Sequence, residues 1–369
     1  DKVYVVTLHA AKKKVTNSSQ IKSDQEVLKS LSMSKIIAPV LIGILVIIYM
    51  VFRQFDWNEF ELIKWDSRLW LYLFIAIFIY FLRHLFYAYR LKILSDDAFS
   101  FKHSIELVCI WEFASAISPT SIGGSAVAVF FLSQEKISAA KAVSIVLYTV
   151  IIDTIFFLIS LVGLYMLFGP ELIRPDKVNL FEGWGITFIV VWLFMLSYGI
   201  ILTWGLFKPN VIKSILRGIA KLPLIRRFKN SLHQIGEDVM LTSLELRTKP
   251  FSFHLKAAVT TIAAWMTRFL TVNFVILALL EIPTDFWSQA LLYARSETMY
   301  AITQFSPTPG GSGTMEFLFS GFFSDFISEG IGSVAALLWR LITYYPYLII
   351  GVFVIPNWVR KVVKLKNKK

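Results

Sequence analysis

Apolar residues gather in six long runs that alternate with shorter polar stretches. These runs are close to the roughly 20 residues with which a helix crosses a bilayer. We therefore predict an all-α polytopic membrane protein. Its six predicted spanning helices are residues 36–52, 69–89, 142–168, 184–207, 257–280 and 333–355.

Two further apolar segments, residues 103–134 and 288–326, are interrupted by short stretches that contain Pro and Gly. Each interruption should end one helix and begin another, and the resulting halves are too short to cross alone. We therefore predict two re-entrant helical hairpins, each of which enters and leaves by one face. The predicted breaks are Ser118, Pro119 and Thr120 in the first hairpin, and Ser306, Pro307, Thr308 and Pro309 in the second.

The sequences around the two breaks are similar. Ser-Pro-Thr at 118–120 recurs at 306–308, and Gly-Gly-Ser at 123–125 recurs at 310–312. Ionisable residues lie at similar distances on both sides of each break: Arg83 and Asp153 flank the first, and Arg268 and Arg340 flank the second. Three spans separate the hairpins, so the second should point the opposite way. This pattern predicts two inverted-topology repeats with a binding site near the bilayer midplane. The alternative is that the breaks are ordinary kinks between packed helices.

We divide the chain on this basis. The predicted parts are a cytoplasmic tail or extension at 1–32, a first membrane repeat at 33–207, a basic amphipathic connection at 208–256, the remainder of the second repeat at 257–360, and a basic tail at 361–369. The first span of the second repeat is residues 184–207. The connection either lies on anionic headgroups or is a solvated helix on the cytoplasmic side.

Composition supports a bilayer as the solvent. Of the 369 residues, 56% are hydrophobic and 17% are charged, whereas soluble domains are more polar. The single cysteine, Cys109, excludes a disulfide-built secreted domain. The net charge of +12 comes from Lys and Arg, of which 28 fall on one predicted face and five on the other. The positive-inside rule then predicts that both termini lie in the cytoplasm. The charge is not attributed to nucleic-acid binding.

The breaks carry the chemistry of an anion site. We expect a half-helix to begin beyond each Gly-Gly-Ser, so that free amides and the positive end of the helix dipole face a shared polar cavity. The glycines would let a phosphate approach the main chain, and the serines would either cap the helix or donate to the ligand. The residues concerned are Gly123, Gly124 and Ser125 in the first hairpin, and Gly310, Gly311, Ser312 and Gly313 in the second.

Charged residues within the apolar segments are costly to insert, so they should be paired or functional. Arginine suits a phosphate because its planar fork forms bidentate hydrogen bonds. Predicted substrate-binding arginines are Arg268, Arg340, Arg83 and Arg295; predicted groups for charge balance or gating are Glu112, Asp153, Glu297 and Glu316. The acidic groups could instead bind a cationic headgroup or carry a proton. The alternative for the arginines is structural pairing, and Arg83 and Arg295 could snorkel to a membrane face. His84 is predicted to be interfacial.

Several catalytic patterns do not occur in the sequence. It contains no Gly-x-x-x-x-Gly-Lys-Ser/Thr, no His-Glu-x-x-His, no cysteine pair and no Gly-x-Ser-x-Gly. We therefore expect transport that ATP does not drive directly, with no metal, no cofactor and no enzymatic activity.

The run from Pro307 to Glu316 has the pattern Pro-x-Pro-Gly-Gly-x-Gly-x-x-Glu, and residues 339–346 follow it in the last span. Together with the first break and Asp153, this run resembles the lysylphosphatidylglycerol synthase transmembrane family over about residues 33–360. The resemblance implies a lipid translocator of the prokaryotic cytoplasmic membrane, similar to the flippase domain of the multiple peptide resistance factor. Many members carry an acidic residue where this chain has Ser125, which leaves the headgroup open.

The predicted function is an ATP-independent lipid flippase that works by alternating access at a midplane polar cavity. The expected partners are a membrane phospholipid or another phosphate-containing lipid, and an anionic membrane surface. Two alternatives remain open at this point: a secondary transporter of a small soluble anion, and an integral-membrane transferase or hydrolase that acts on lipid headgroups.

Overall fold

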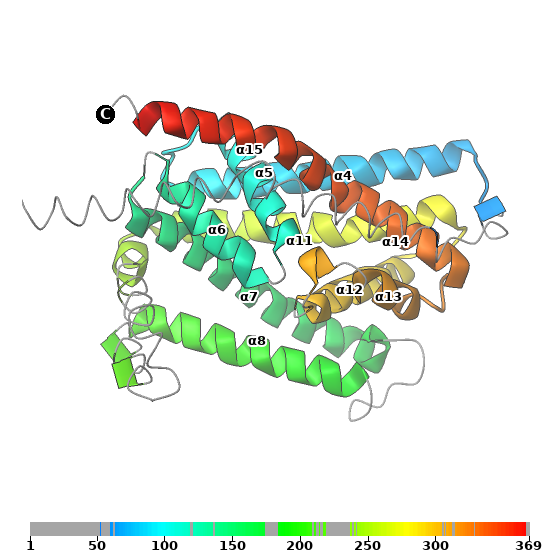
Figure 1. Ribbon diagram of the computed structural model, residues 1–369. Helices are drawn as coiled ribbons and strands as arrows, with labels where there is room; N and C mark the ends of the chain where they lie inside the picture. The colour runs from blue at the N-terminus through cyan, green and yellow to red at the C-terminus, as the bar shows by residue number, and fades with distance from the viewer. Residues whose placement is uncertain are drawn as a thin grey trace, which may run out of the picture.

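The computed structural model describes Phe52 and most of residues 60–366. Its longest gaps within that range are residues 174–183 and 219–236, and only isolated positions of 209–241 are described. The described residues do not include the predicted tail at 1–32, nearly all of the predicted span 36–52, or most of residues 209–241 in the predicted amphipathic connection. All regular elements of the described residues are helices (Figure 1).

Four helical segments of the described chain are long and apolar enough to cross a membrane. They are α4 (Ser67–Leu94), α7 (Ala139–Phe168) with the short helix η1 (Gly169–Leu172), α11 (Phe251–Leu279), and α14 (Glu329–Thr343) continued by α15 (Tyr345–Lys366). Each corresponds to one of the predicted spans, and only α11 ends before the predicted bound, at Leu279 and not at residue 280. Helix α8 (Trp184–Phe207) has the predicted bounds of 184–207, but its described apolar part is shorter than these four.

In both broken segments one α-helix ends before the break and another follows, as predicted. The first contains α5 (Phe101–Ile117) and α6 (Ser121–Ser133), and the second contains α12 (Phe286–Thr303), the short helix η3 (Pro309–Gly311) and α13 (Thr314–Phe322). The expected start of the first half-helix was wrong: α6 begins at Ser121, so Gly123 and Gly124 lie inside its first turn. In the second segment, α13 begins after the glycines, as expected.

Helix starts follow from local side-chain chemistry. A carboxylate or hydroxyl that precedes a helix can accept a hydrogen bond from one of the four amides that lack a partner in the first turn. Four helices begin in this way, and their N-caps are Asp66 for α4, Ser100 for α5, Ser138 for α7 and Asp285 for α12.

The long helices form an elongated bundle in which α4 packs along α11 and runs in the opposite direction (Figure 1). Helix α15 covers α5, and α8 packs on α7. The pair α5 and α6 lies toward one end of the bundle in Figure 1, and α12 and α13 lie toward the other. The outer faces of α4 and α11 are apolar; they expose Trp70, Phe74, Phe78 and Phe81 on α4, and Leu255, Val259, Ile262 and Met266 on α11. Such contiguous apolar stripes suit contact with lipid.

Candidate functional site

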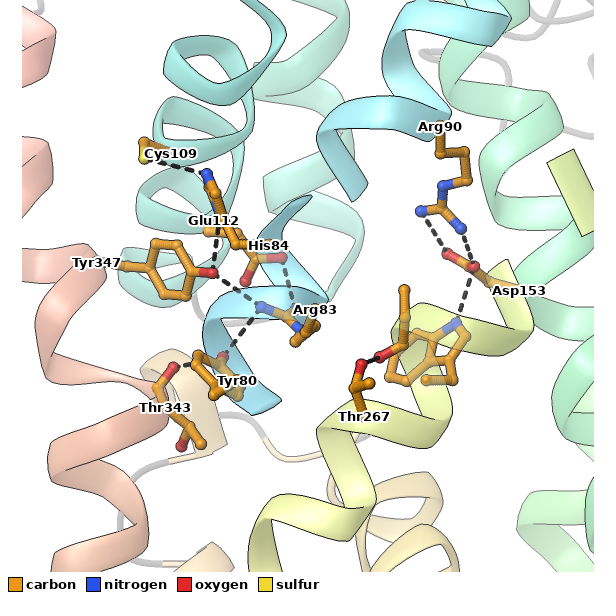
Figure 2. A network of polar contacts seen from close by, with 12 residues as sticks. Tyr80, Arg83, His84, Arg90, Cys109, Glu112, Asp153, Thr267, Thr343 and Tyr347 are labelled. Carbon is orange, nitrogen blue, oxygen red and sulfur yellow. Dashed lines mark hydrogen bonds and ion pairs between the residues drawn. The ribbon is translucent and has the colours of Figure 1, made fainter. Parts of the chain in front are cut away.

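Arg83, in the middle of α4, lies at the centre of a buried polar network (Figure 2). Arg83 is 1% exposed, and its Nη2 donates to Oε1 of Glu112 on α5 at 2.7 Å. Its Nη1 donates to the hydroxyls of Tyr80 and Tyr347, each at 3.0 Å. Additional hydrogen bonds help a buried ion pair to offset the cost of leaving water, and the two tyrosine hydroxyls provide them for Nη1 of Arg83. The burial of Arg83 excludes the alternative that its side chain snorkels to a membrane face.

The Tyr80 hydroxyl connects this network to the break between α14 and α15. Pro346 has no N–H, and the Tyr347 amide bonds to the carbonyl of Tyr344, only three residues earlier. The carbonyl of Thr343 accepts instead from the Tyr80 hydroxyl, at 2.7 Å. A helix interruption inside an apolar environment requires such a replacement partner.

His84 is buried next to Arg83, so its predicted interfacial position was also wrong. Its Nδ1 lies 3.0 Å from the Tyr347 hydroxyl, and its Nε2 lies 3.2 Å from the carbonyl oxygen of Ile105. The Cys109 sulfur is 3.6 Å from the same Nε2. His84 therefore ties α4 to both α5 and α15.

A second ion pair lies two turns further along α4. Nη1 of Arg90 donates to Oδ1 of Asp153 on α7 at 2.6 Å and to Oγ1 of Thr261 on α11 at 3.0 Å. The indole N–H of Trp265 donates to the same Asp153 oxygen at 2.9 Å. Arg90 was counted among the predicted cytoplasmic charges and was not predicted as a site residue. Its spacing from Arg83 could have revealed it, since both residues fall on one face of α4.

Aromatic rings join the two ion pairs. The guanidinium carbons of Arg83 and Arg90 each lie 4.5 Å from the centroid of the Tyr87 ring. The Tyr87 ring in turn contacts the Trp265 ring edge to face. Cation–π contacts of this kind are strongest where water is excluded. The network is therefore continuous across α4, α5, α7 and α11.

Arg268 on α11 faces the same region. Its guanidinium carbon lies 4.3 Å from the Tyr300 ring centroid and 5.5 Å from that of Trp265. It lies close enough to Arg83 and Glu112 to interact with both electrostatically. Its Nε is buried without a hydrogen-bond partner, and within the described residues no carboxylate forms a salt bridge with it. Of the two guanidinium groups, only that of Arg83 forms a salt bridge with Glu112 among the described residues.

The two broken segments meet at Tyr344. The Tyr344 hydroxyl donates to the carbonyl of Ala116, at the end of α5, at 3.0 Å. Its ring packs against Gly310 of the second break, where an added Cβ would lie 2.2 Å from a ring carbon. Gly310 also has a φ of 57°, which favours glycine. The guanidinium carbon of Arg340 lies 3.9 Å from the Tyr344 ring centroid. The predicted break residues and Arg340 are therefore neighbours in space.

The second break is braced by hydroxyl groups. Ser306 Oγ lies 2.8 Å from Oγ1 of Thr308 and 2.9 Å from Oγ1 of Thr314, the first residue of α13. Gly311 has a φ of 69°. Other predicted break positions lie outside the described part of the chain: Pro119, Thr120, Pro307, Ser312 and Gly313. The side chain of Glu316 is likewise not described, although its backbone belongs to α13.

Two predicted site residues lie away from this centre. Arg295 on α12 is 1% exposed and is bound to Asp325 at 2.5 Å and, through Nε, to the carbonyl of Glu171 at 2.9 Å. It stabilises the connection between α12, η1 and the segment after α13, and it does not snorkel to a membrane face. Glu297, also on α12, is completely buried and accepts from Ser160 on α7. Asp325, near the end of the predicted hairpin at 288–326, was not predicted as a site residue.

The fold and this buried charged network define a multi-pass helical membrane protein with a polar interior. The chain belongs to the family described as the lysylphosphatidylglycerol synthase TM region, whose model matches residues 36–351. It is similar to a UPF0104 membrane protein of Archaeoglobus fulgidus, with 26% identity over 329 residues that cover 84% of this chain and 94% of the relative. No solved structure matches the chain.

Proposed function

We propose that this protein is an ATP-independent flippase for a phosphate-containing lipid of the prokaryotic cytoplasmic membrane. The observation that carries the proposal is the pair of buried arginines on α4 and α11, Arg83 and Arg268, of which only Arg83 forms a salt bridge with a carboxylate, Glu112, among the described residues. The family's description names a phospholipid, lysylphosphatidylglycerol, which agrees with a lipid substrate. The protein moves this lipid and does not convert it chemically.

The arrangement of the helices supports alternating access. Helices α4 and α11, which hold matching places in the two proposed repeats, run in opposite directions (Figure 1). The broken segments approach from opposite ends and meet at Tyr344. In this proposal they are re-entrant hairpins of an inverted repeat, and the site between them opens to one face and then to the other.

The lipid phosphate would bind where positive charge is in excess. Arg268 has a buried Nε without a partner and provides a fork for two phosphate oxygens. Arg340 lies at the junction of the breaks and faces the same lipid path in this proposal. Glu112 neutralises Arg83 when no phosphate is present. The acyl or isoprenoid tails remain in the surrounding lipid, against the apolar outer faces of α4 and α11.

Reconstitution tests this function directly. Purified protein is placed in vesicles that contain headgroup-labelled phospholipid, and transbilayer movement is followed by exposure of the label to an impermeant quencher. Arg268→Ala should slow movement by about tenfold or more, since a charge-assisted hydrogen bond contributes roughly 1.5–3 kcal/mol. Arg340→Ala should also slow it, whereas Arg268→Lys should retain part of the activity.

The matched control is Arg360→Ala, which removes an exposed arginine near the end of α15. Its rate should equal that of the wild type. Unchanged rates in folded Arg268→Ala and Arg340→Ala proteins would contradict the phosphate site. Transport of a water-soluble headgroup analogue would favour a soluble-anion transporter, and chemical conversion of the lipid would favour an enzyme.

A further inference from the structure

Glu297 is a buried carboxylic acid. It lies in the middle of α12 and has 0% exposed surface. Its Oε2 accepts from the Ser160 hydroxyl of α7 at 2.9 Å, and the Tyr293 hydroxyl, one turn earlier on α12, also lies beside the carboxyl. Its Oε1 is buried and accepts no hydrogen bond. Within the described residues, no Lys, Arg or His forms a salt bridge with it.

The protonation state follows from this environment. An ionised carboxylate that is removed from water without a cation costs several kcal/mol, so such a group takes up a proton instead. The neutral acid keeps the Ser160 bond and carries no net charge. Arg295 is only two residues away, but its side chain is bound to Asp325 and to the Glu171 carbonyl. It therefore does not neutralise Glu297.

The other titratable groups around α12 do not supply a counter-charge either. Elements packed against α12 carry titratable groups as follows: Lys141, Tyr148, Asp153 and Tyr165 on α7, Glu171 on η1, Tyr198 on α8, His254, Lys256 and Arg268 on α11, and Glu316 on α13. Asp153 is paired with Arg90, Lys141 is paired with Asp96, His254 lies beside the Tyr148 hydroxyl, and Lys256 is exposed. The remaining cation is Arg268, which lies over Tyr300, one turn beyond Glu297 on α12.

The first broken segment has a carboxylate, Glu112, at the position that matches Glu297, and the two differ in whether they are paired. Phe101 begins α5 and Phe286 begins α12, and Glu112 and Glu297 stand at the same distance from these starts. Glu112 is paired with Arg83 of α4. The corresponding pair would be Glu297 with Arg268 of α11, and it is not formed. In this conformation one carboxylate is therefore paired and its counterpart is not.

We propose that Glu297 is a proton-binding site of the transport cycle, neutral in this conformation, which releases its proton when it pairs with Arg268 in the opposite-facing conformation. This inference rests on the proposed flippase function, which supplies the two conformations. The balance is one proton: the carboxyl loses it to water as the carboxylate gains the guanidinium as partner, and it takes the proton up again when the pair separates. Lipid movement is then coupled to a pH gradient.

Infrared difference spectroscopy detects the proton without any transport. The wild-type protein at pH 7 should show the C=O stretching band of a protonated carboxyl, and Glu297→Gln should remove it. Ser160→Ala should shift the frequency of the band, because it removes the hydrogen bond to the carboxyl. Glu112→Gln is the matched control and should leave the band in place, since Glu112 is ionised. A band that Glu297→Gln leaves intact would overturn the proposal.

Coupling is tested in the vesicle assay. A pH gradient across the membrane should change the wild-type rate of lipid movement several-fold, and Glu297→Gln should abolish this response. Wild-type protein that moves lipid at the same rate with and without the gradient would overturn the coupling. Wild-type protein that moves no lipid would contradict the proposed function, and the carboxyl band would then still decide whether Glu297 binds a proton.

Discussion

At the scale of single residues, small side chains determine how closely the broken helices pack. Gly124 of α6 lies against Ser115 of α5, where an added Cβ would be 2.3 Å from the Ser115 hydroxyl oxygen and 2.8 Å from its Cα. Gly351 of α15 lies against Phe113 of α5 in the same way. Gly124 was predicted to admit a phosphate to the main chain. The contact with Ser115 gives it a packing role between the two half-helices.

Gly124→Ala should therefore separate α6 from α5 and destabilise the protein by about 1–3 kcal/mol, the usual cost of overpacking. The matched control is Gly163→Ala in α7, where an added Cβ meets nothing within 4 Å. That substitution should be neutral or stabilising, because alanine favours helix more than glycine does. Thermal unfolding in detergent measures both. Equal effects of the two substitutions would show that the contact with Ser115 is unimportant.

Single ionisable residues were predictable where they interrupt an apolar run. Arg83, Glu112, Asp153 and Arg268 stand out in this way, and the structure brings them into one region. Their partners were not predictable, because pairing depends on how helices distant in sequence pack. The same limit explains why Arg90 was missed: it lies where an apolar run gives way to polar residues, and only the position of α7 shows that it is buried.

At the scale of elements, charged clusters fix the connections between helices. Asp96, in the turn after α4, has a φ of 54° and accepts from Lys141 at the start of α7 and from Lys249 before α11, each at 2.6 Å. Burial opposes its charged form, but the hydrogen bonds and charges of the two lysines outweigh burial and hold the pKa of Asp96 below its ordinary value. This turn thereby joins three helices at one end of the bundle.

Asp96→Asn should lower stability at pH 7 by about 1 kcal/mol, near the upper end for exposed ion pairs, because two lysines lose their partner. A carboxylate whose pKa is depressed by folding stabilises the protein above its unfolded pKa, and the contribution disappears as the pH falls through the folded value. The difference between variant and wild type should therefore be fully present above about pH 4 and should decrease as the pH falls further, through the lower folded pKa. Thermal unfolding as a function of pH is the measurement.

Asp97→Asn is the matched control, because Asp97 also has a positive φ, of 59°, but contacts only Lys92, at 3.4 Å, and its side chain is 77% exposed. It should change stability little at any pH. If Asp96→Asn is still less stable than the wild type at low pH, the loss of stability comes from the backbone of the turn and not from the charge of Asp96.

Helix boundaries show which elements the sequence could predict. Long apolar runs located α4, α7, α11 and the α14–α15 segment, since length and composition suffice for a spanning helix. The early start of α6 at Ser121 was missed because glycine permits a helix as well as a turn. The break before Tyr345 was also missed, although Pro346 signalled it, because the apolar run continues through it.

At the scale of the whole molecule, apolar surface lies outside and charge lies inside. Aromatic and aliphatic side chains cover the exposed faces of α4, α8 and α11, whereas Arg83, Arg295, Glu297 and Arg340 are almost completely buried. Two apolar clusters meet at the polar centre, with Trp265 in one cluster and Tyr87 and Tyr344 in the other. A bilayer can solvate this apolar surface, and under the proposed function the headgroup binds in the charged interior.

The opposite directions of α4 and α11 make the proposed topology testable, because they place the starts of α5 and α12 on opposite membrane faces. In a Cys109→Ser background, Lys102→Cys and Thr284→Cys each introduce one thiol at an exposed position beside these starts. The distribution of Lys and Arg predicts that a membrane-impermeant maleimide added to intact cells labels position 284, and that position 102 reacts only in inside-out vesicles. If both positions react from the same side, the two broken segments enter by one face, and alternating access at their junction has no structural basis.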